Sequence, residues 1–456
     1  MIGTMLLSGL AEQLDGEIIG DNVEISALST DTRALKKGDT YLALVGPNFN
    51  GNDFLMEAES NGAIAAIVSN PISKHAQPLP LLRVKDTHLA LGKIASINRE
   101  RSTARVIALT GSQGKTTVKE MIGAILCREG ETLITQANQN NTVGVPLTLL
   151  QITDQHKFAV IEIGADCHGE IEFSAAMAKP NIVLITNANA AHIEGFGSLQ
   201  GIVEAKGEII GTAEESASII LNADDENVAQ WIERAAGKKV IQFSAANPQA
   251  DCYAKDTVVG KKGVVSFTLS TPRGLERISL QLLGKHNVTN AVAAATAALE
   301  VGASLKSIGE GLGSLVPVNR RLNPRVGFNS CCVVDDTYNA SPSSFKAAID
   351  VLVLFPERKI LIAGDMKELG SEAEESHRKV GRYASDSGVD GLWTVGDLSS
   401  LASAELGKKG KHFATTNELI YACKALAASD VVFLVKGSRG AHMEVIVDEL
   451  IEAGGD

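Results

Sequence analysis

Residues 106–117 read Val-Ile-Ala-Leu-Thr-Gly-Ser-Gln-Gly-Lys-Thr-Thr, and a helical pattern follows as far as Cys127. An apolar strand therefore leads into a glycine-containing loop that opens a helix. The N–H groups of such a loop and of the helix start point at an anion, and the helix dipole favours its negative charge. Gly111 and Gly114 allow backbone conformations and a close approach that a Cβ atom would block. We refer to residues 110–117 as the phosphate loop.

The residues at the end of the loop favour a nucleoside triphosphate as the anion. Lys115 would reach the β- and γ-phosphates, and the hydroxyl of Thr116 would bind Mg²⁺. The general pattern G-x-x-x-x-G-K-[ST] expects glycine at position 109, where this chain has Leu109. The chain therefore has a shorter form of this pattern, Thr110-Gly-x-x-Gly-Lys-Thr116, in which Thr110 and Gly111 make the turn. The strand–loop–helix context favours this interpretation over a chance Gly-Lys-Thr in a turn.

Around the phosphate loop, apolar strands alternate with helical patterns over residues 87–316. Strands are expected at 158–163, 182–185 and 219–221, and strands of this kind are typical of a mostly parallel sheet covered on both faces. From Cys252 to Leu283 the pattern changes to hairpin-like strands with a turn at 260–263, followed by an alanine-rich helix at 288–300. This stretch predicts a central nucleotide-binding domain.

The stretches before and after the central one have different patterns of strands, helices and turns. Residues 1–86 contain short β-like pieces broken by turns, which predicts a small α/β domain. Residues 317–456 repeat the alternation of strands and helices, with strands expected at 331–334, 360–363, 391–395 and 431–435 and helices at 342–354 and 372–387. We therefore predict an α/β chain of three domains, the last doubly wound and Rossmann-like.

Composition excludes several classes of partner. The chain has 456 residues with 42 Lys and Arg against 54 Asp and Glu, a net charge of −12. Nucleic acids and anionic membranes need a dense basic surface, so neither is an expected partner. With no signal-peptide pattern and no apolar run of about 18 residues, we expect a cytoplasmic protein, as a monomer. Without a CxxC pair, reduced core thiols are expected at Cys127, Cys167, Cys252, Cys331, Cys332 and Cys423.

Polar residues beyond the phosphate loop are weaker candidates for chemistry. Glu162 ends an apolar run, and a buried carboxylate there needs a partner or a metal ion. His192 follows a strand, where a histidine whose hydrogen bonds are satisfied within the loop is the more usual interpretation. Lys206 lies in a helical pattern where lysine is usually solvated. A polar loop that includes Asn138, Asn140, Asn141 and Thr142 could bind a substrate or simply form a turn.

Together these segments closely resemble the Mur ligase family over nearly the whole chain. Ile161-Glu-Ile-Gly-Ala165 is similar to the strand whose glutamate, here Glu162, binds Mg²⁺. Residues 187–198 resemble the stretch with a metal-binding histidine, here His192. Ala205-Lys-Gly207 resembles the position of a carbamylated lysine, here Lys206, that supports a second Mg²⁺. The resemblance thus implies ATP, two Mg²⁺ sites that include Thr116, and catalytic roles for Lys115, Glu162, His192 and Lys206.

The same resemblance implies a set of nucleotide contacts. Gly284-Lys-His-Asn-Val-Thr-Asn290 is similar to the family segment whose last asparagine approaches adenine, and Arg321 to an arginine that contacts phosphate. Arg320 and Ser341 stand where the family usually has glycine and asparagine. The implied nucleotide-binding residues are Thr110, Gly111, Ser112, Gln113, Gly114, Lys115, Thr116, Thr117, Asn290, Arg321, Asp336, Tyr338 and Asn339.

Other segments resemble particular branches of the family. Residues 29–33 and 43–47 are similar to the UDP-sugar-binding domain of its two later ligases, and residues 364–370 and 436–444 to the members that add a dipeptide. The implied reaction joins D-alanyl-D-alanine to UDP-N-acetylmuramoyl-tripeptide through an acyl phosphate, in peptidoglycan synthesis. The implied substrate-binding residues are Ser29, Thr30, Arg33, Gly46, Asn138, Asn141, Thr142, Lys436, Ser438 and Arg439.

Three alternative functions share part of this sequence pattern. A sibling ligase that adds the third amino acid often has Asp-Asn-Pro-Arg within its last domain; Leu322-Asn-Pro-Arg325 differs at its first residue and is expected to precede the first strand there. A folylpolyglutamate synthase shares the phosphate loop but lacks the first domain. A P-loop ATPase that drives a partner would hydrolyse ATP without either ligase substrate. Because nucleotide contacts come from two domains, we expect the third domain to close over ATP about a hinge at 317–321.

Overall fold

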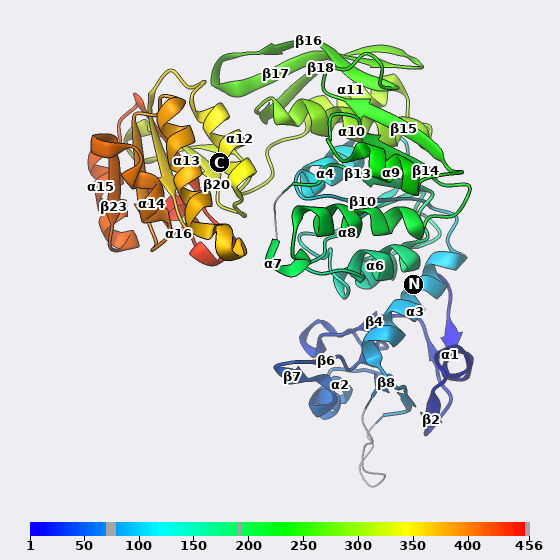
Figure 1. Cartoon of the computed structure of the whole chain (residues 1–456). Helices are drawn as coiled ribbons and strands as arrows, with labels where there is room; N and C mark the ends of the chain where they lie inside the picture. The colour runs from blue at the N-terminus through cyan, green and yellow to red at the C-terminus, as the bar shows by residue number, and fades with distance from the viewer. Residues whose placement is uncertain (70–78, 190–192, 452–456) are drawn as a thin grey trace.

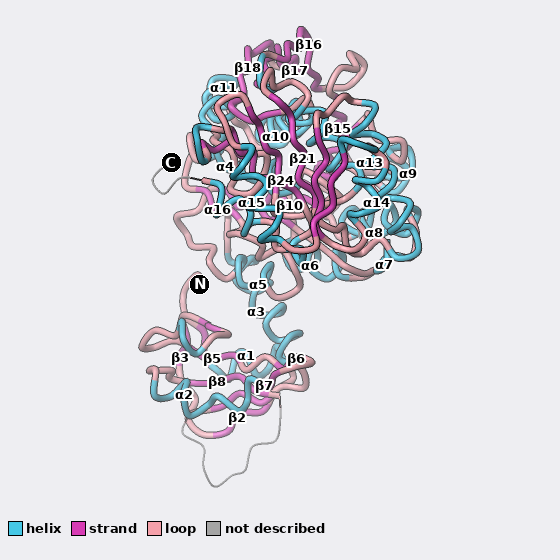
Figure 2. The backbone as a smooth tube through the Cα atoms, turned by 90° about the vertical axis from the view of Figure 1, so that its left-hand side faces the viewer, coloured by secondary structure: helices cyan, strands magenta, loops and turns pink. Residues whose placement is uncertain are grey.

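Three sheets, of five, nine and six strands in chain order, organise the residues that the computed structural model describes, which are 1–69, 79–189 and 193–451. Each sheet has its own stretch of the chain, and the three stretches follow one another from the N-terminus to the C-terminus (Figure 1). The α/β fold class with parallel sheets is therefore confirmed. Helix α3 (Thr87–Arg101) runs from the first sheet to the central one, and both views show it between them (Figures 1 and 2).

The central sheet has the phosphate-loop strand among its inner strands. Its order is β11-β12-β10-β13-β14-β15-β16-β17-β18, parallel as far as β16 and antiparallel beyond it. The parallel part and the hairpin at its edge agree with the sequence pattern. The strands are β10 (Arg105–Thr110), β11 (Thr132–Ile134), β12 (Phe158–Glu162), β13 (Ile182–Ile185), β14 (Ser218–Asn222), β15 (Lys239–Ser244), β16 (Cys252–Val259), β17 (Val264–Thr271) and β18 (Gly274–Leu283).

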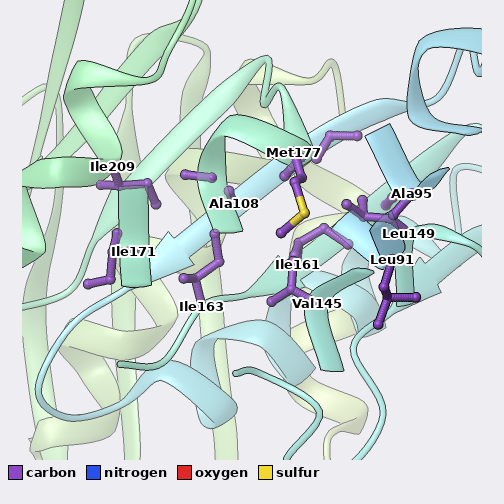
Figure 3. Packing of buried hydrophobic residues seen from close by; sticks show 14 of the residues in the cluster. Leu91, Ala95, Ala108, Val145, Leu149, Ile161, Ile163, Ile171, Met177 and Ile209 are labelled. Carbon is purple, nitrogen blue, oxygen red and sulfur yellow. The ribbon is translucent and has the colours of Figure 1, made fainter. Parts of the chain in front are cut away.

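Helices cover both faces of this sheet, because alternate residues of its strands point to opposite sides. Val106 and Ala108 pack with α3, α5, α6 and α8, whereas Ile107 and Leu109 pack with α4, α10 and α11. Figure 3 shows the first of these layers, where Met177 lies among side chains from α3 and α5. The helices are α4 (Lys115–Leu126), α5 (Gly144–Leu149), α6 (Glu170–Ala178), α7 (Ile193–Phe196), α8 (Leu199–Gly211), α9 (Val228–Arg234), α10 (His286–Glu300) and α11 (Leu305–Ser314).

The first sheet is small and mixed. Its order is β2-β9-β8-β5-β4, with β2 antiparallel to β9 and the other pairs parallel. A short hairpin and a second strand pair lie beside it. The elements are β1 (Met5–Leu6), α1 (Leu7–Leu14), β2 (Glu17–Ile19), β3 (Glu24–Ile25), β4 (Leu28–Ser29), β5 (Thr40–Leu42), β6 (Val45–Gly46), β7 (Phe49–Asn50), α2 (Leu55–Ser60), β8 (Ala65–Val68) and β9 (Leu81–Arg83).

The third sheet has the order β19-β20-β24-β21-β22-β23 and is parallel except for β19. Its helices pack on both faces, as a doubly wound domain requires. The elements are β19 (Asn323–Val326), β20 (Cys332–Asp336), α12 (Pro342–Leu352), β21 (Arg358–Ala363), α13 (Ala373–Asp386), β22 (Gly391–Val395), α14 (Ser399–Ala404), β23 (Gly410–Phe413), α15 (Thr416–Leu426), β24 (Val431–Lys436) and α16 (Glu444–Leu450).

Two expectations from the sequence were wrong. The Leu322-Asn-Pro-Arg325 segment does not precede the first strand of the third sheet, because residues 323–326 are themselves the antiparallel edge strand β19. An edge position tolerates Pro324, which has no N–H to donate. Cys127 and Cys167 are exposed rather than core thiols. Among the described residues, no helix is long and apolar enough to cross a membrane.

The side chain of Asn98 joins the N-terminus to the central domain. It is almost fully buried, accepts a hydrogen bond from Ile2 N (2.6 Å) and donates to the carbonyls of Leu149 (2.9 Å) and Ile152 (3.1 Å). We predict that Asn98→Ala lowers the free energy of unfolding by about 2–3 kcal/mol, because three buried backbone groups lose their partner. Thermal denaturation measures this, with the exposed Gln151→Ala as a control. Equal midpoints for the two variants would contradict the prediction.

Candidate functional site

A cavity of about 970 Å³ lies at the carboxyl ends of the central strands. The phosphate loop, the polar loop at 138–142 and the end of β12 form one wall. Residues that follow β20 and β21 of the third sheet form another. Ligands of open α/β sheets bind beyond the carboxyl ends of the strands, so both sheets present their expected binding edge to one space.

The phosphate loop has the backbone that its glycines suggested. Gly111 has φ +150° and Gly114 has φ +79°, and a Cβ on Gly111 would lie 2.0 Å from Thr186 Oγ1. Lys115 Nζ donates to the Gly111 carbonyl at 2.6 Å, so the ammonium lies across the loop. Burial lowers the pKa of Lys115, while the nearby Glu162 opposes that shift. The loop thus directs a fixed amine and a helix N-terminus into the cavity.

Glu162 is buried beside the start of α4. Its Oε1 accepts from Asn140 Nδ2 at 2.7 Å and from Thr116 Oγ1 at 3.2 Å, and the residue is 1% exposed. Its Oε2 is buried and has no hydrogen-bond partner among the described residues. A buried carboxylate oxygen without a partner is unfavourable unless a cation binds it. Together with the Thr116 hydroxyl, this oxygen fits a hard divalent cation such as Mg²⁺.

Lys206 of α8 also lines the cavity, contrary to the usual solvated position of a helical lysine. It is 4% exposed, and its Nζ lies 5.3 Å from the centre of the Phe196 ring. Burial lowers the pKa of Lys206 to about 7, and Lys115 adds to that shift. His192 lies outside the described residues. Within those residues no group of three or more His, Cys, Asp or Glu could hold a metal ion.

Cationic side chains and a tyrosine ring lie on the wall of the cavity opposite the phosphate loop. Arg321 Nη2 donates to Thr116 Oγ1 at 3.1 Å, and its guanidinium lies 4.0 Å from the centre of the Tyr338 ring. The buried Lys436 pairs with Asp336 at 2.6 Å and donates to the Asn339 carbonyl at 2.9 Å. Lys436 therefore braces the loop after β20 as well as lining the cavity.

Direct contacts connect the two walls. Gln113 Nε2 donates to Ser341 Oγ at 2.9 Å and also to Ser343 Oγ, at the start of α12. The predicted hinge at 317–321 leads into this wall. Arg320 within it has φ +62°, and Leu322 directly after it has φ +44°. Left-handed backbone of this kind is strained for residues with a Cβ atom.

Most of the sequence-predicted site residues line this one cavity. It includes those from Gly111 to Thr117, together with Asn138, Asn141, Thr142, Glu162, Lys206, Asn290, Arg321, Asp336, Tyr338, Asn339 and Lys436.

The remaining predicted residues lie elsewhere. Thr110 is buried behind the loop, Ser438 Oγ accepts from Lys367 N at 2.8 Å, and Arg439 pairs with Glu444 at 3.4 Å. A further group belongs to the first domain, away from the cavity lining: Ser29, Thr30, Arg33 and Gly46.

Sequence reasoning missed several residues of the cavity wall. Asn187 accepts from Ser112 N through its carbonyl (3.0 Å) and from Gln113 N through Oδ1 (3.0 Å), and it thereby orients the phosphate loop. Lys367 and Glu368 follow β21 and line the third-domain side. Each of these residues follows the carboxyl end of a parallel strand, which is the signal that could have identified them.

Comparisons with known proteins agree with this geometry. A model described as the Mur ligase middle domain matches residues 109–298, and one described as the Mur ligase, glutamate ligase domain matches residues 320–439. A UDP-N-acetylmuramoyl-tripeptide–D-alanyl-D-alanine ligase of Escherichia coli (strain K12) is 43% identical over 99% of this chain and 99% of its own length.

Two solved structures extend the likeness to three dimensions. A crystal structure of MurF from Acinetobacter baumannii has a TM-score of 0.91 and 35% identity and covers 98% of each chain. A structure of MurF ligase from Thermotoga maritima in complex with ADP has a TM-score of 0.82 and 26% identity, over 93% of this chain and 96% of that one.

The phosphate loop yields a direct test of nucleotide binding. A Cβ on Gly114 would lie 2.5 Å from Asn290 Oδ1 on a backbone with φ +79°. We therefore predict that Gly114→Ala weakens binding of a non-hydrolysable ATP analogue at least about tenfold, since strain of about 1–2 kcal/mol adds to the clash. Calorimetric titration measures it. Gly9→Ala, where a Cβ meets nothing within 4 Å, is the control; unchanged affinity in Gly114→Ala would contradict the prediction.

Proposed function

The chain belongs to the Mur ligase family, and we propose that it joins D-alanyl-D-alanine to UDP-N-acetylmuramoyl-tripeptide at the expense of ATP. The main support for this proposal is that the phosphate loop and the loop after β20 line the same cavity. The names of the full-length relatives support the choice of substrates. The terminal carboxylate of the tripeptide attacks the γ-phosphate of ATP, and ADP leaves as an acyl phosphate forms. The amine of the dipeptide then attacks the acyl carbon, phosphate and a proton leave, and an amide forms.

The phosphate loop and Lys115 would bind the triphosphate of ATP. Lys115 and Arg321 bring two cations to the cavity from its two walls, where an anionic carboxylate must approach an anionic phosphate. Arg321 is held by Thr116 and by the Tyr338 ring, so it would be oriented before the substrates bind. Asn290, near Gly114, would lie close to the nucleotide.

Thr116 and Glu162 would hold a Mg²⁺ ion. When bound, the ion supplies charge neutralisation at the phosphates, as metals do in phosphoryl transfer. The unpartnered Glu162 Oε2 and the adjacent hydroxyl support this assignment. Asn140 would keep the carboxylate oriented through its hydrogen bond to Oε1.

We assign Lys206 as the site of a carbamate that contributes to a second Mg²⁺ site with His192. An amine is a poor ligand for Mg²⁺, which prefers oxygen, whereas a carbamate offers two oxygens. The neutral amine attacks carbon dioxide, an N–C bond forms, and the released proton passes to solvent. A lysine with a pKa of about 7 has a large neutral fraction at physiological pH, so burial favours this reaction.

We propose a substrate role for each of the three domains from the family resemblance of its segments. Residues 1–86 would hold the UDP-sugar-peptide through Ser29, Thr30, Arg33 and Gly46. The polar loop of the central domain, residues 87–316, would orient its peptide through Asn138, Asn141 and Thr142. Residues 317–456 would receive the dipeptide near Lys436, Ser438 and Arg439, where Lys436 and Arg439 already pair with carboxylates.

Phosphate release distinguishes this proposal from its rivals. With ATP, Mg²⁺ and UDP-N-acetylmuramoyl-tripeptide, we expect phosphate release that depends on D-alanyl-D-alanine. Mass spectrometry should then detect the product with the dipeptide attached. Release with single amino acids would indicate a sibling ligase. Release with neither substrate would indicate a P-loop ATPase that drives a partner.

Substitution of Lys206 tests the proposed carbamate. We expect Lys206→Ala to lose activity by at least about a hundredfold, because the carbamate oxygens are lost, and short carboxylates such as acetate to restore part of it. Carbamate formation in the unmodified protein, followed by ¹³C NMR with labelled carbon dioxide, should increase as the pH rises from 6 to 8 through the pKa of about 7, because the neutral amine is the reactive form. Full activity in Lys206→Ala, or no labelled carbamate, would contradict the assignment.

A further inference from the structure

Helix α4 carries a second lysine that the mechanism does not use. Lys119 lies one helical turn after Lys115 and is 1% exposed. It is absent from the lining of the cavity, so its ammonium does not face the nucleotide site. A buried ammonium is unfavourable unless it is paired and hydrogen-bonded. Its partners therefore indicate what holds it there.

Two oxygen atoms hold the ammonium of Lys119. Nζ donates to the Thr135 carbonyl at 2.7 Å and lies 2.8 Å from Glu120 Oε1. Glu120 is the next residue of the same helix and is partly exposed. Thr135 is fully buried and follows β11 directly. The ammonium thus connects helix α4 to the end of the neighbouring strand.

Thr135 continues the connection to the catalytic carboxylate. Its Oγ1 accepts from the backbone N–H of Glu162 at 3.0 Å, and its own N–H donates to the Val160 carbonyl at 3.0 Å. The residue therefore binds the end of β12 on both sides of Ile161. Two hydrogen bonds in series, one on its carbonyl and one on its hydroxyl, link Lys119 to the residue that bears the carboxylate.

Residues 136–142, which include the polar loop, follow Thr135 directly. Asn140, five residues after Thr135, donates to Glu162 Oε1 at 2.7 Å, and its carbonyl accepts from Gly164 N at 2.7 Å. Ala137 in between has φ +46°, an unfavourable backbone for alanine that the surrounding contacts must maintain. An anchor at Thr135 thus fixes both the backbone of Glu162 and the loop that orients its side chain.

We infer that Lys119 is a positioning residue that sets Glu162 and the 136–142 loop against helix α4 through Thr135. The helix carries Lys115 and Thr116, and the carboxylate must lie close to the Thr116 hydroxyl if both are to contact one cation; in the structure Glu162 Oε1 is 3.2 Å from that hydroxyl. A shift of β11 and β12 along α4 would separate these two groups. The inference rests on the proposed role of Glu162 in cation binding.

Manganese binding tests the inference directly. With ADP present, electron paramagnetic resonance measures the dissociation constant of Mn²⁺, and hydrogen exchange measures protection of the Glu162 amide. Lys119→Met keeps the length of the side chain and removes the donor. We expect it to weaken Mn²⁺ binding about tenfold and to accelerate exchange at Glu162, because one buried hydrogen bond in the series is lost.

Variants of Thr135 separate positioning from folding. Thr135→Val should reproduce both effects, whereas Thr135→Ser, which keeps the hydroxyl, should restore them. Thr296→Val is the matched control, since this buried threonine donates to Val292 O at 2.7 Å within α10 and is no partner of Glu162 or of the 136–142 segment. If Lys119→Met does not fold, Lys119→Gln, which shortens the side chain and removes its charge, takes its place, while Thr135→Val and Thr135→Ser test the hydrogen bond between the Thr135 hydroxyl and Glu162 N. Normal Mn²⁺ affinity and normal Glu162 protection in folded Lys119→Met or Thr135→Val would overturn the inference.

Glu162→Gln distinguishes a failure of this inference from a failure of the proposed function. If Glu162→Gln binds Mn²⁺ normally, the proposed cation role of Glu162 is wrong, and the amide exchange of Glu162 in Lys119→Met still decides whether Lys119 positions it. If Glu162→Gln loses Mn²⁺ while Lys119→Met and Thr135→Val retain it, the proposed function stands and the positioning role is wrong.

Discussion

The burial of one carboxylate constrains the whole catalytic region. Glu162 is at the end of an inner parallel strand, with one oxygen bound to Asn140 and Thr116 and the other without a hydrogen-bond partner among the described residues. A buried charge of this kind must be offset by cations close by. Lys115, Arg321 and the proposed Mg²⁺ site all lie on the same cavity, so the arrangement around Glu162 is also the arrangement that a triphosphate needs.

The third domain completes this environment. Arg321 reaches the Thr116 hydroxyl from the segment between the central and third domains, and Gln113 reaches the start of α12. These contacts hold the third domain against the phosphate loop, and strained backbone at Arg320 and Leu322 lies in the segment that joins the two. Such strain persists only where surrounding contacts stabilise the segment by more than the strain costs. Here those contacts are Arg321 with Thr116 and Gln113 with Ser341.

Much of the fold could be predicted from the sequence because its strongest patterns are local. The buried runs at 182–185 and 391–395 became β13 and β22 with the same ends, since β-branched and aromatic residues bounded by turns favour strands. Weaker patterns failed. The short strands β11 and β15 carry few apolar residues in a row, and β19 contains a proline that argues against a strand, so only pairing with a neighbour could reveal them.

The same division applies to the site. The sequence by itself determined the phosphate loop, because glycines, a lysine and a threonine at fixed spacing are enough to specify an anion-binding turn. It also supplied Glu162 and Lys206 as candidates, through a strand end and a family resemblance. Only the tertiary structure decided that Lys206 is buried, that Lys436 braces Asp336 and that Lys119 connects α4 to Thr135. Burial and the pairing of charges depend on residues far apart in the chain, and no local pattern records which of them meet.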